Sequence, residues 1–139
     1  MFVLDTNVLS VMMSARPVER VASWLLKQCS DELFTAAVCQ AEVLAGIAVL
    51  PSGHRRSELE VAARPMFADD FEGRVLAFDA EAATAYTALF AARRRAGRST
   101  ATIDLMIAAI AKVHGASVVT RNVDDFDESG LTVINPWNG

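Results

Sequence analysis

The sequence predicts an α/β fold in which helices flank a parallel β-sheet. Short apolar runs, typical of buried strands, alternate along the chain with longer segments of helical periodicity. This order favours parallel strands joined by helical crossovers. A chain of 139 residues, 53% of them hydrophobic, is also long enough to form a sizeable core. We therefore expect a single domain over residues 1–139.

Five short apolar segments are the predicted strands. Each is three to five residues long, and each is followed by a polar, capping or turn residue. In chain order the predicted strands are 2–4, 33–35, 74–78, 117–120 and 131–134.

Six helices are expected between these strands. Thr6 or Asn7 is a suitable cap for the first helix and Asp79 for the fifth, while Ser99 or Thr100 begins the sixth. Gly97 and Gly115 are helix-ending residues. The predicted helices are 8–13, 17–25 with Pro17 in its first turn, 37–50, 55–70 with a kink or end at Pro65, 80–96 and 100–114. The inward positions of the second and fifth are Val18, Val21, Leu25, Ala82, Ala83, Tyr86, Leu89 and Phe90.

Composition narrows the possible function. A net charge of -4 argues against a strong non-specific polyanion binder, although a nuclease whose acids are neutralised by metal stays possible. Cys29 and Cys39 both lie in apolar surroundings and are expected to be reduced core thiols. No uninterrupted apolar run reaches the length of a membrane span, and the N-terminal run lacks a basic flank. We expect a cytoplasmic protein without a membrane segment.

Three carboxylates lie where an ionised group is most costly. Asp5 closes the run Phe2–Leu4, and Glu42 and Asp104 each lie within an apolar segment that contains no lysine or arginine. A buried carboxylate without a partner is strongly unfavourable, so a cation must compensate it. Acids from distant parts of the chain, each embedded in core-like sequence, indicate a shared acidic pocket with a divalent metal.

Each acid also has a purely structural interpretation. Asp5 is a possible helix cap, Glu42 can point outward from its helix, and Asp104 suits the first turn of a helix, where the dipole favours it. Asp5 and Asn122 both follow a predicted strand directly, however. In parallel sheets, ligands bind beyond the carboxyl ends of the strands, so both residues are expected at that crevice.

Taken in order, these segments resemble a known family. Five segments, in this order, are together similar to a PIN domain. They are Leu4-Asp5-Thr6-Asn7, Glu42 in an apolar helix, Asp104 in Ile-Asp-Leu-Met-Ile, the stretch 120–126 and the tail 133–137. The tail in particular resembles the FitB-like branch of the VapC toxin ribonucleases. The likeness covers essentially the whole chain.

The resemblance implies a three-layer α/β/α sandwich with a five-stranded parallel sheet and Mg²⁺- or Mn²⁺-dependent RNA cleavage. By position, Asp5, Glu42 and Asp104 become the metal-binding acids. The fourth family position is often an aspartate, but this chain has Asn122 there, and an amide supplies no charge. Asp125 lies three residues later and is the candidate for the missing charge. Asp124 and Asp127 are also near.

The ligand types agree with this chemistry. Oxygen ligands favour hard cations such as Mg²⁺ and Mn²⁺, and no His or Cys set has zinc spacing. The hypothesis is hydrolysis of an RNA phosphodiester by a metal-activated water. Thr6 and Asn7 are expected either to orient Asp5 or a water or simply to cap a helix, and Thr120 either bonds a ligand or ends its strand.

Basic residues and partners complete the expectations. Arg121 is placed to contact a phosphate or to pair with a nearby aspartate. The cluster of Arg93, Arg94 and Arg95 reads as a solvated helix end, with a phosphate-binding rim as the alternative. The resemblance further implies a cognate VapB- or FitA-like antitoxin and a homodimer, for which Trp24 and Leu25 are interface or core candidates.

Two other functions compete with the ribonuclease. One is a phosphatase of the haloacid dehalogenase type with Asp5 as nucleophile, but such enzymes carry a second aspartate two residues later, where this chain has Asn7. The other is a catalytically impaired PIN-like module that binds RNA or a partner without cutting. Asn122 is the feature that favours this second alternative.

Overall fold

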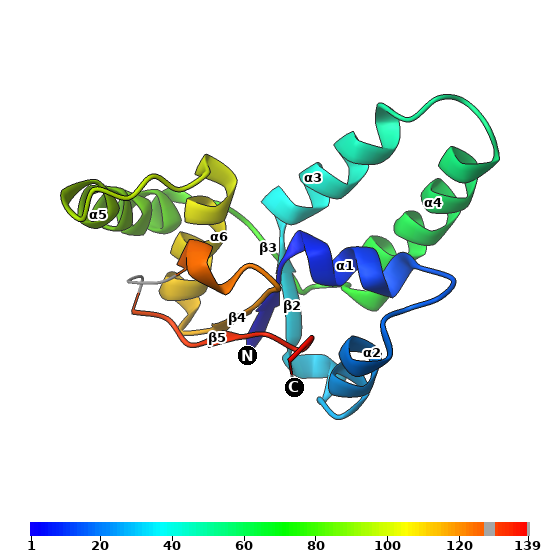
Figure 1. Ribbon diagram of the computed structural model, residues 1–139, viewed down its shortest axis with the longest axis horizontal. Coiled ribbons are helices and arrows are strands. Elements are labelled where there is room, and N and C mark those ends of the chain that lie inside the picture. Colours follow the sequence, from blue (N-terminus) through cyan, green and yellow to red (C-terminus); the bar gives the residue numbers. More distant parts are fainter. Residues whose placement is uncertain (127–129, 139) are drawn as a thin grey trace.

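A computed structural model describes residues 1–126 and 130–138 of the chain. Its centre is a five-stranded parallel sheet with the strand order β3-β2-β1-β4-β5, which confirms the predicted fold class (Figure 1). The strands are β1 (Phe2–Leu4), β2 (Leu33–Ala36), β3 (Val75–Leu76), β4 (Ser117–Val119) and β5 (Val133–Ile134).

The register of the central strands places two polar residues side by side. Leu4 of β1 pairs with Val119 of β4. The Asp5 N–H then donates to the Val119 carbonyl at 2.9 Å, so the ladder continues one residue beyond β1. Asp5 and Thr120 therefore leave the sheet together at its carboxyl edge, where parallel sheets bind ligands.

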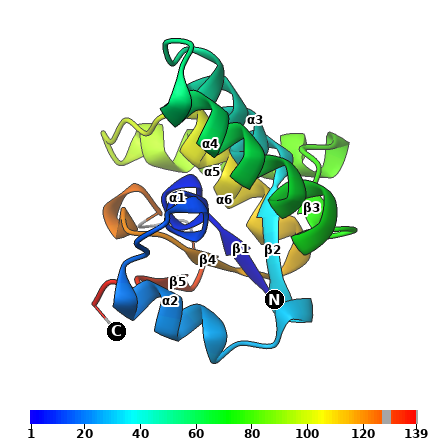
Figure 2. The ribbon, with the colours of Figure 1, turned by 90° about the vertical axis from the view of Figure 1, so that its right-hand side faces the viewer.

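Helices cover both faces of the sheet, with α5 and α6 on one side and α1 and α2 on the other (Figure 1). In both views α3 and α4 form a hairpin that projects beyond the carboxyl ends of the strands (Figure 2). Within the described residues no helix is long and apolar enough to cross a membrane. The helices are α1 (Thr6–Met13), α2 (Glu19–Leu26), α3 (Ala37–Ala48), α4 (His54–Pro65), α5 (Ala80–Arg95) and α6 (Thr102–His114).

One part of the core lies between β1, β4 and helix α6, and another includes Val8 and Leu9 of α1. Ile107 and Ile110 of α6 are fully buried, as are the strand residues Val3 and Val118. Several alanines in the same helix, with Ala109 at 0% exposure, allow α6 to approach the sheet closely. Asp104 precedes this buried run by one residue and stands in the first turn of α6.

Helix α6 begins later than predicted. Its first residue is Thr102 and its N-cap is Ala101, which offers no side-chain bond, so the expected start at Ser99 or Thr100 is wrong. The Thr100 hydroxyl instead accepts a 2.6 Å bond from Nε of Arg93. Arg93 is only 6% exposed and therefore belongs to the packed junction between α5 and α6, not to a solvated helix end.

Some predicted helix details are also corrected. The cap of α1 is Asp5, not Thr6 or Asn7. Helix α2 starts after Pro17, and α4 ends at Pro65 as expected before a π-helical turn over Met66–Asp70. Three side chains expected inside, Val18, Ala83 and Phe90, are exposed, and so is Cys29.

Candidate active site

Asp5 occupies the carboxyl end of the central strand and is 4% exposed. Its Oδ1 accepts a 2.7 Å bond from the Thr6 N–H, and its backbone carbonyl accepts from the N–H groups of Val8 and Leu9. Asp5 is thus the N-cap of α1, where a carboxylate is favoured by unpaired N–H groups. The structural interpretation of this residue is correct, and it does not exclude a second role for Oδ2.

The second oxygen of Asp5 is held from the neighbouring strand. The Thr120 hydroxyl donates to Oδ2 at 2.7 Å, and it accepts from Asn7 Nδ2 at 3.3 Å and from the Asn122 N–H at 3.0 Å. A hydroxyl has one proton and two lone pairs, so all its hydrogen-bonding capacity is used. Thr120 therefore fixes the carboxylate of Asp5 and does more than end β4.

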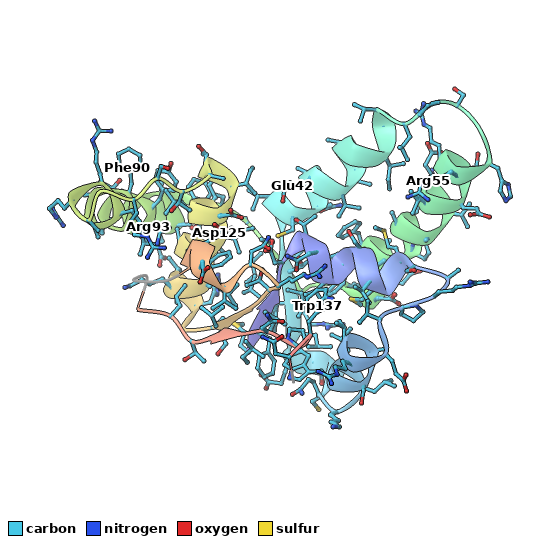
Figure 3. All side chains as sticks on the ribbon, viewed as in Figure 1. Glu42, Arg55, Phe90, Arg93, Asp125 and Trp137 are labelled. Carbon is cyan, nitrogen blue, oxygen red and sulfur yellow. The ribbon has the colours of Figure 1, made fainter. Side chains whose placement is uncertain are left out.

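Glu42 reaches the site from α3. Its Oε1 accepts a 2.6 Å bond from the Thr6 hydroxyl, although Glu42 itself is exposed (Figure 3). Thr6 therefore connects two carboxylates, since its N–H binds Asp5 and its hydroxyl binds Glu42. The charge of Glu42 contributes to raising the pKa of Asp5, so the two acids interact.

Asp104 and Asp125 bring two further carboxylates into this electrostatic group. Burial and then the charges of Asp5, Asp125 and Glu42, in that order, together raise the pKa of Asp104 to about 6. The pKa of Asp5 is raised mainly by burial and then by Glu42 and Asp125, against the bonds from Thr120 and Thr6, which lower it. Four acids from distant parts of the sequence thus repel one another across one site.

The segment after β4 contains the candidates for the fourth acidic position of the family, and they differ in exposure and in their influence on the other acids. The Asn122 carbonyl accepts from the Asp125 N–H at 3.1 Å, which closes the short 3-10 turn Val123–Phe126. Asn122 itself is exposed, whereas the charge of Asp125 reaches both Asp5 and Asp104. Asp124 is exposed, and its carbonyl accepts from Arg98. Asp127 lies outside the described residues.

The carboxylate oxygens suit a hard divalent cation, but the acidic side chains do not form a complete metal-binding site. Carboxylate oxygens are the ligands that Mg²⁺ and Mn²⁺ prefer. Over residues 1–126 and 130–138, however, no three His, Cys, Asp or Glu side chains stand close enough to hold one ion together.

Arg121 lies beside the acids on the β4 side. Its N–H donates to Asn7 Oδ1 at 3.3 Å, and its carbonyl accepts from Asn135 Nδ2 at 3.5 Å. Its guanidinium lies 5.6 Å from the centre of the Trp137 ring. The expected pairing with Asp124 or Asp125 does not occur in the described residues, where the three ion pairs involve other groups.

A groove of about 870 Å³ leads away from Thr6 and Glu42. It runs between α1, α3 and α4, and it has an apolar floor with charged residues on its rim. Its apolar lining residues are Met13, Val43, Ile47, Leu50 and Leu59, and its rim includes Arg16, Arg55 and Glu58.

Two neighbours of the site were not predicted from the sequence: Cys39, whose pKa is affected by Asp5, and Trp137, which contacts Arg121. Cys39 is fully buried, and its pKa is raised to about 12 by burial and then by the charge of Asp5. A signal was available, because Cys39 precedes Glu42 by three residues, a spacing that puts both on one helical face. Trp137 follows the last strand, but its contact with Arg121 depends on how β4 and β5 pair.

A comparison with family models finds the PIN domain over residues 2–130. Three curated relatives align with almost the whole chain. Plasmid stability protein StbB of Pseudomonas syringae is 42% identical, over 99% of this chain and 99% of its own. VapC ribonuclease Y4jK of Sinorhizobium fredii is 37% identical (99% and 98%), and toxin FitB of Neisseria gonorrhoeae is 33% identical (99% and 99%).

The solved structures agree with this assignment. The structure of FitAB bound to IR36 DNA fragment contains a chain that is 34% identical to this one, with a TM-score of 0.91 over 99% of this chain and 96% of that one. Sequence and fold thus agree over the same residues. The chain belongs to the PIN domain family, in the group that includes the VapC ribonucleases and toxin FitB.

Proposed function

We propose that this protein is the toxin of a type II toxin–antitoxin pair and that it hydrolyses RNA phosphodiester bonds with the help of Mg²⁺ or Mn²⁺. The observation that carries the catalytic part is the electrostatic group of Asp5, Glu42, Asp104 and Asp125 at the carboxyl edge of the sheet. The relatives named VapC ribonuclease and toxin FitB support the same function.

In this proposal Asp5, Glu42 and Asp104 hold the cation, and Asp125 supplies the charge that Asn122 lacks. Thr120 and Thr6 orient Asp5, because each donates to a different oxygen of its carboxylate. Asn7 keeps the Thr120 hydroxyl pointing at Asp5 by donating to its oxygen. When bound, the cation would lower the pKa of a water molecule and neutralise phosphate charge.

The raised pKa of Asp104, about 6, supports a cation at this position. Near neutral pH its carboxylate is largely ionised, although burial and three nearby carboxylates disfavour its charge. A divalent cation would relieve the repulsion among the four acids and stabilise the folded chain.

An antitoxin of the VapB or FitA type is the proposed partner. The groove between α1, α3 and α4 begins at Thr6 and Glu42 and has an apolar floor that suits a peptide segment. An arginine of such a segment would be attracted by the acidic site. Two of the matched structures are named FitAB and FitAcB, and these joint names agree with a paired partner. We further propose a homodimer and, because its substrate is cellular RNA, a cytoplasmic location.

A module that binds RNA without cutting it is the second candidate. Asn122 favours this function, since it removes a charge from the position where the family often has an aspartate. In that case RNA would be retained without product in either metal.

Cleavage of total cellular RNA tests the proposal. The purified chain is incubated with Mn²⁺, with Mg²⁺ or with EDTA, beside Asp104→Asn and the matched control Asp124→Asn, which removes an exposed acid on the same side. We expect cleavage by the wild type and by Asp124→Asn with metal, and none in EDTA or by Asp104→Asn. Equal cleavage in EDTA would refute the metal requirement, and RNA bound but uncut in both metals would establish the second candidate.

A further inference from the structure

Arg121 and Trp137 form a cation–π pair next to the acidic site. The guanidinium lies 5.6 Å from the centre of the indole ring, within the range of a cation–π contact. Figure 3 labels Trp137 lower in the view than Asp125 and Glu42. Neither residue belongs to the acidic group.

The backbone of both residues is fixed through one amide side chain. Asn135 Nδ2 donates to the Arg121 carbonyl at 3.5 Å, and Asn135 Oδ1 accepts from the Trp137 N–H at 2.9 Å. The Trp137 carbonyl accepts from Arg20 at 3.4 Å. The tail after β5 is therefore tied to the segment after β4, and the Arg121 guanidinium lies over the Trp137 ring.

The position of Arg121 is also coupled to that of Asp5. The Arg121 N–H donates to Asn7, which donates to Thr120, which in turn donates to Asp5. Because Arg121 follows Thr120 directly, its location relative to the acids is set by the same network. A ligand that contacts Arg121 is thereby held in register with the carboxylates.

The chemistry of Arg121 selects an anionic ligand. Its guanidinium carbon lies over the indole ring, and a guanidinium carries five N–H donors whose geometry matches a phosphate. Over residues 1–126 and 130–138 no carboxylate forms an ion pair with it. An arginine beside four acids that makes no ion pair with them is suited to a phosphate that those acids would otherwise repel.

We propose that Arg121, which lies over the Trp137 ring, binds a phosphate of the RNA next along the strand from the one that is cut. This subsite rests on the proposed ribonuclease function and adds a substrate-positioning contact to it. Holding the guanidinium in place before RNA arrives reduces the entropy lost on binding. Trp137 acts through Arg121 and is a positioning residue.

Binding is tested apart from cleavage by fluorescence anisotropy with a labelled single-stranded oligoribonucleotide in EDTA. Arg121→Ala should weaken binding about tenfold, as expected for a lost charge-assisted hydrogen bond. It should also lower the slope of log affinity against log salt by about 0.7, the value for one phosphate on a single strand. Arg64→Ala is the matched control, because it removes an exposed arginine from α4.

Trp137→Leu should weaken binding about two- to fivefold, the effect of an exposed cation–π contact, whereas Trp137→Phe should stay near wild type. In the Arg121→Ala background Trp137→Leu should cause no further loss, because the two act as one unit. Additive losses would show that Trp137 acts independently of Arg121 and would overturn its role. Thermal melting checks that the variants fold.

Two results for Arg121 would overturn the subsite: an affinity of Arg121→Ala equal to that of Arg64→Ala, or a loss with an unchanged salt slope. Failure of the ribonuclease function would be seen separately: the wild type would bind RNA in an Arg121-dependent way but would not cleave it in Mn²⁺. Cleavage by Arg121→Ala with an unchanged KM would refute the subsite while leaving the ribonuclease function intact. The expected result is a raised KM with little change in kcat.

Discussion

The Thr120 hydroxyl donates a 2.7 Å hydrogen bond to Oδ2 of Asp5, from a position 115 residues away in the chain. The bond exists because β1 and β4 are neighbours in register and both end at this edge. Two donors, Asn7 and the Asn122 N–H, occupy the lone pairs of the same hydroxyl. Its proton therefore has one destination, the carboxylate of Asp5.

Thr120→Val should weaken Mn²⁺ binding about 10- to 100-fold, the usual effect of losing a group that orients a metal ligand. Valine has the same shape but no hydroxyl, so Asp5 loses the bond that lowers its pKa. Thr120→Ser keeps the hydroxyl and should bind Mn²⁺ nearly as the wild type does. Isothermal titration calorimetry measures both affinities. Equal Mn²⁺ affinity for the valine variant and the wild type would show that Asp5 does not need this bond.

Asp125→Asn should reduce RNA cleavage at least about tenfold, because it removes one of four interacting charges without changing side-chain size. Asp124→Asn, its exposed neighbour in the same 3-10 turn, is the matched control and should leave the rate unchanged. Initial rates in Mn²⁺ give the comparison. If both variants cleave like the wild type, Asp125 is not the residue that compensates for Asn122.

Much of the fold could be predicted because its signals are local. The buried strand Phe2–Leu4, the Asp79 cap of α5 and the left-handed Gly115 after α6 each depend on a few adjacent residues. The start of α6 could not be predicted in this way. Thr100 is a good capping residue, but its hydroxyl is occupied by Arg93, which lies seven residues earlier on α5.

The candidate site also has features that local sequence signals predict and features that depend on the tertiary fold. Carboxylates in apolar runs predicted one shared site, and the structure places Asp5, Glu42 and Asp104 within electrostatic reach of one another. Glu42 is exposed, however, so it is not one of the buried charges that the sequence predicted. The choice between Asn122 and Asp125 depended on a 3-10 turn whose geometry four residues of sequence do not determine. The contact between Arg121 and Trp137 requires β4 and β5 to be paired first.

Asp104→Asn should stabilise the metal-free protein at pH 7.5 and have almost no effect below about pH 3, where the carboxyl is protonated in both the folded and the unfolded state. The folded-state pKa of Asp104 is about 6, above its ordinary value of 3.8, so ionisation costs stability as pH rises through this interval. The gain should be about 1 to 2 kcal/mol, since one pKa unit is worth about 1.4 kcal/mol and solvent screening reduces the full value. Urea unfolding in EDTA at several pH values measures it. A gain that is constant with pH would have a cause other than this ionisation.

Of the two cysteines, only Cys29 should react with a thiol reagent in the folded protein. Cys29 is exposed, whereas Cys39 is fully buried beneath Asp5, and its pKa of about 12 leaves almost no thiolate at pH 8. Titration with Ellman's reagent should give one equivalent in buffer and two in denaturant. Cys29→Ser should be unreactive until it unfolds, and Cys39→Ser should keep the fast equivalent. Rapid reaction of native Cys29→Ser would mean that α3 opens at Cys39. Because Glu42 lies three residues further along the same helix, α3 would then not hold Glu42 rigidly at the acidic site.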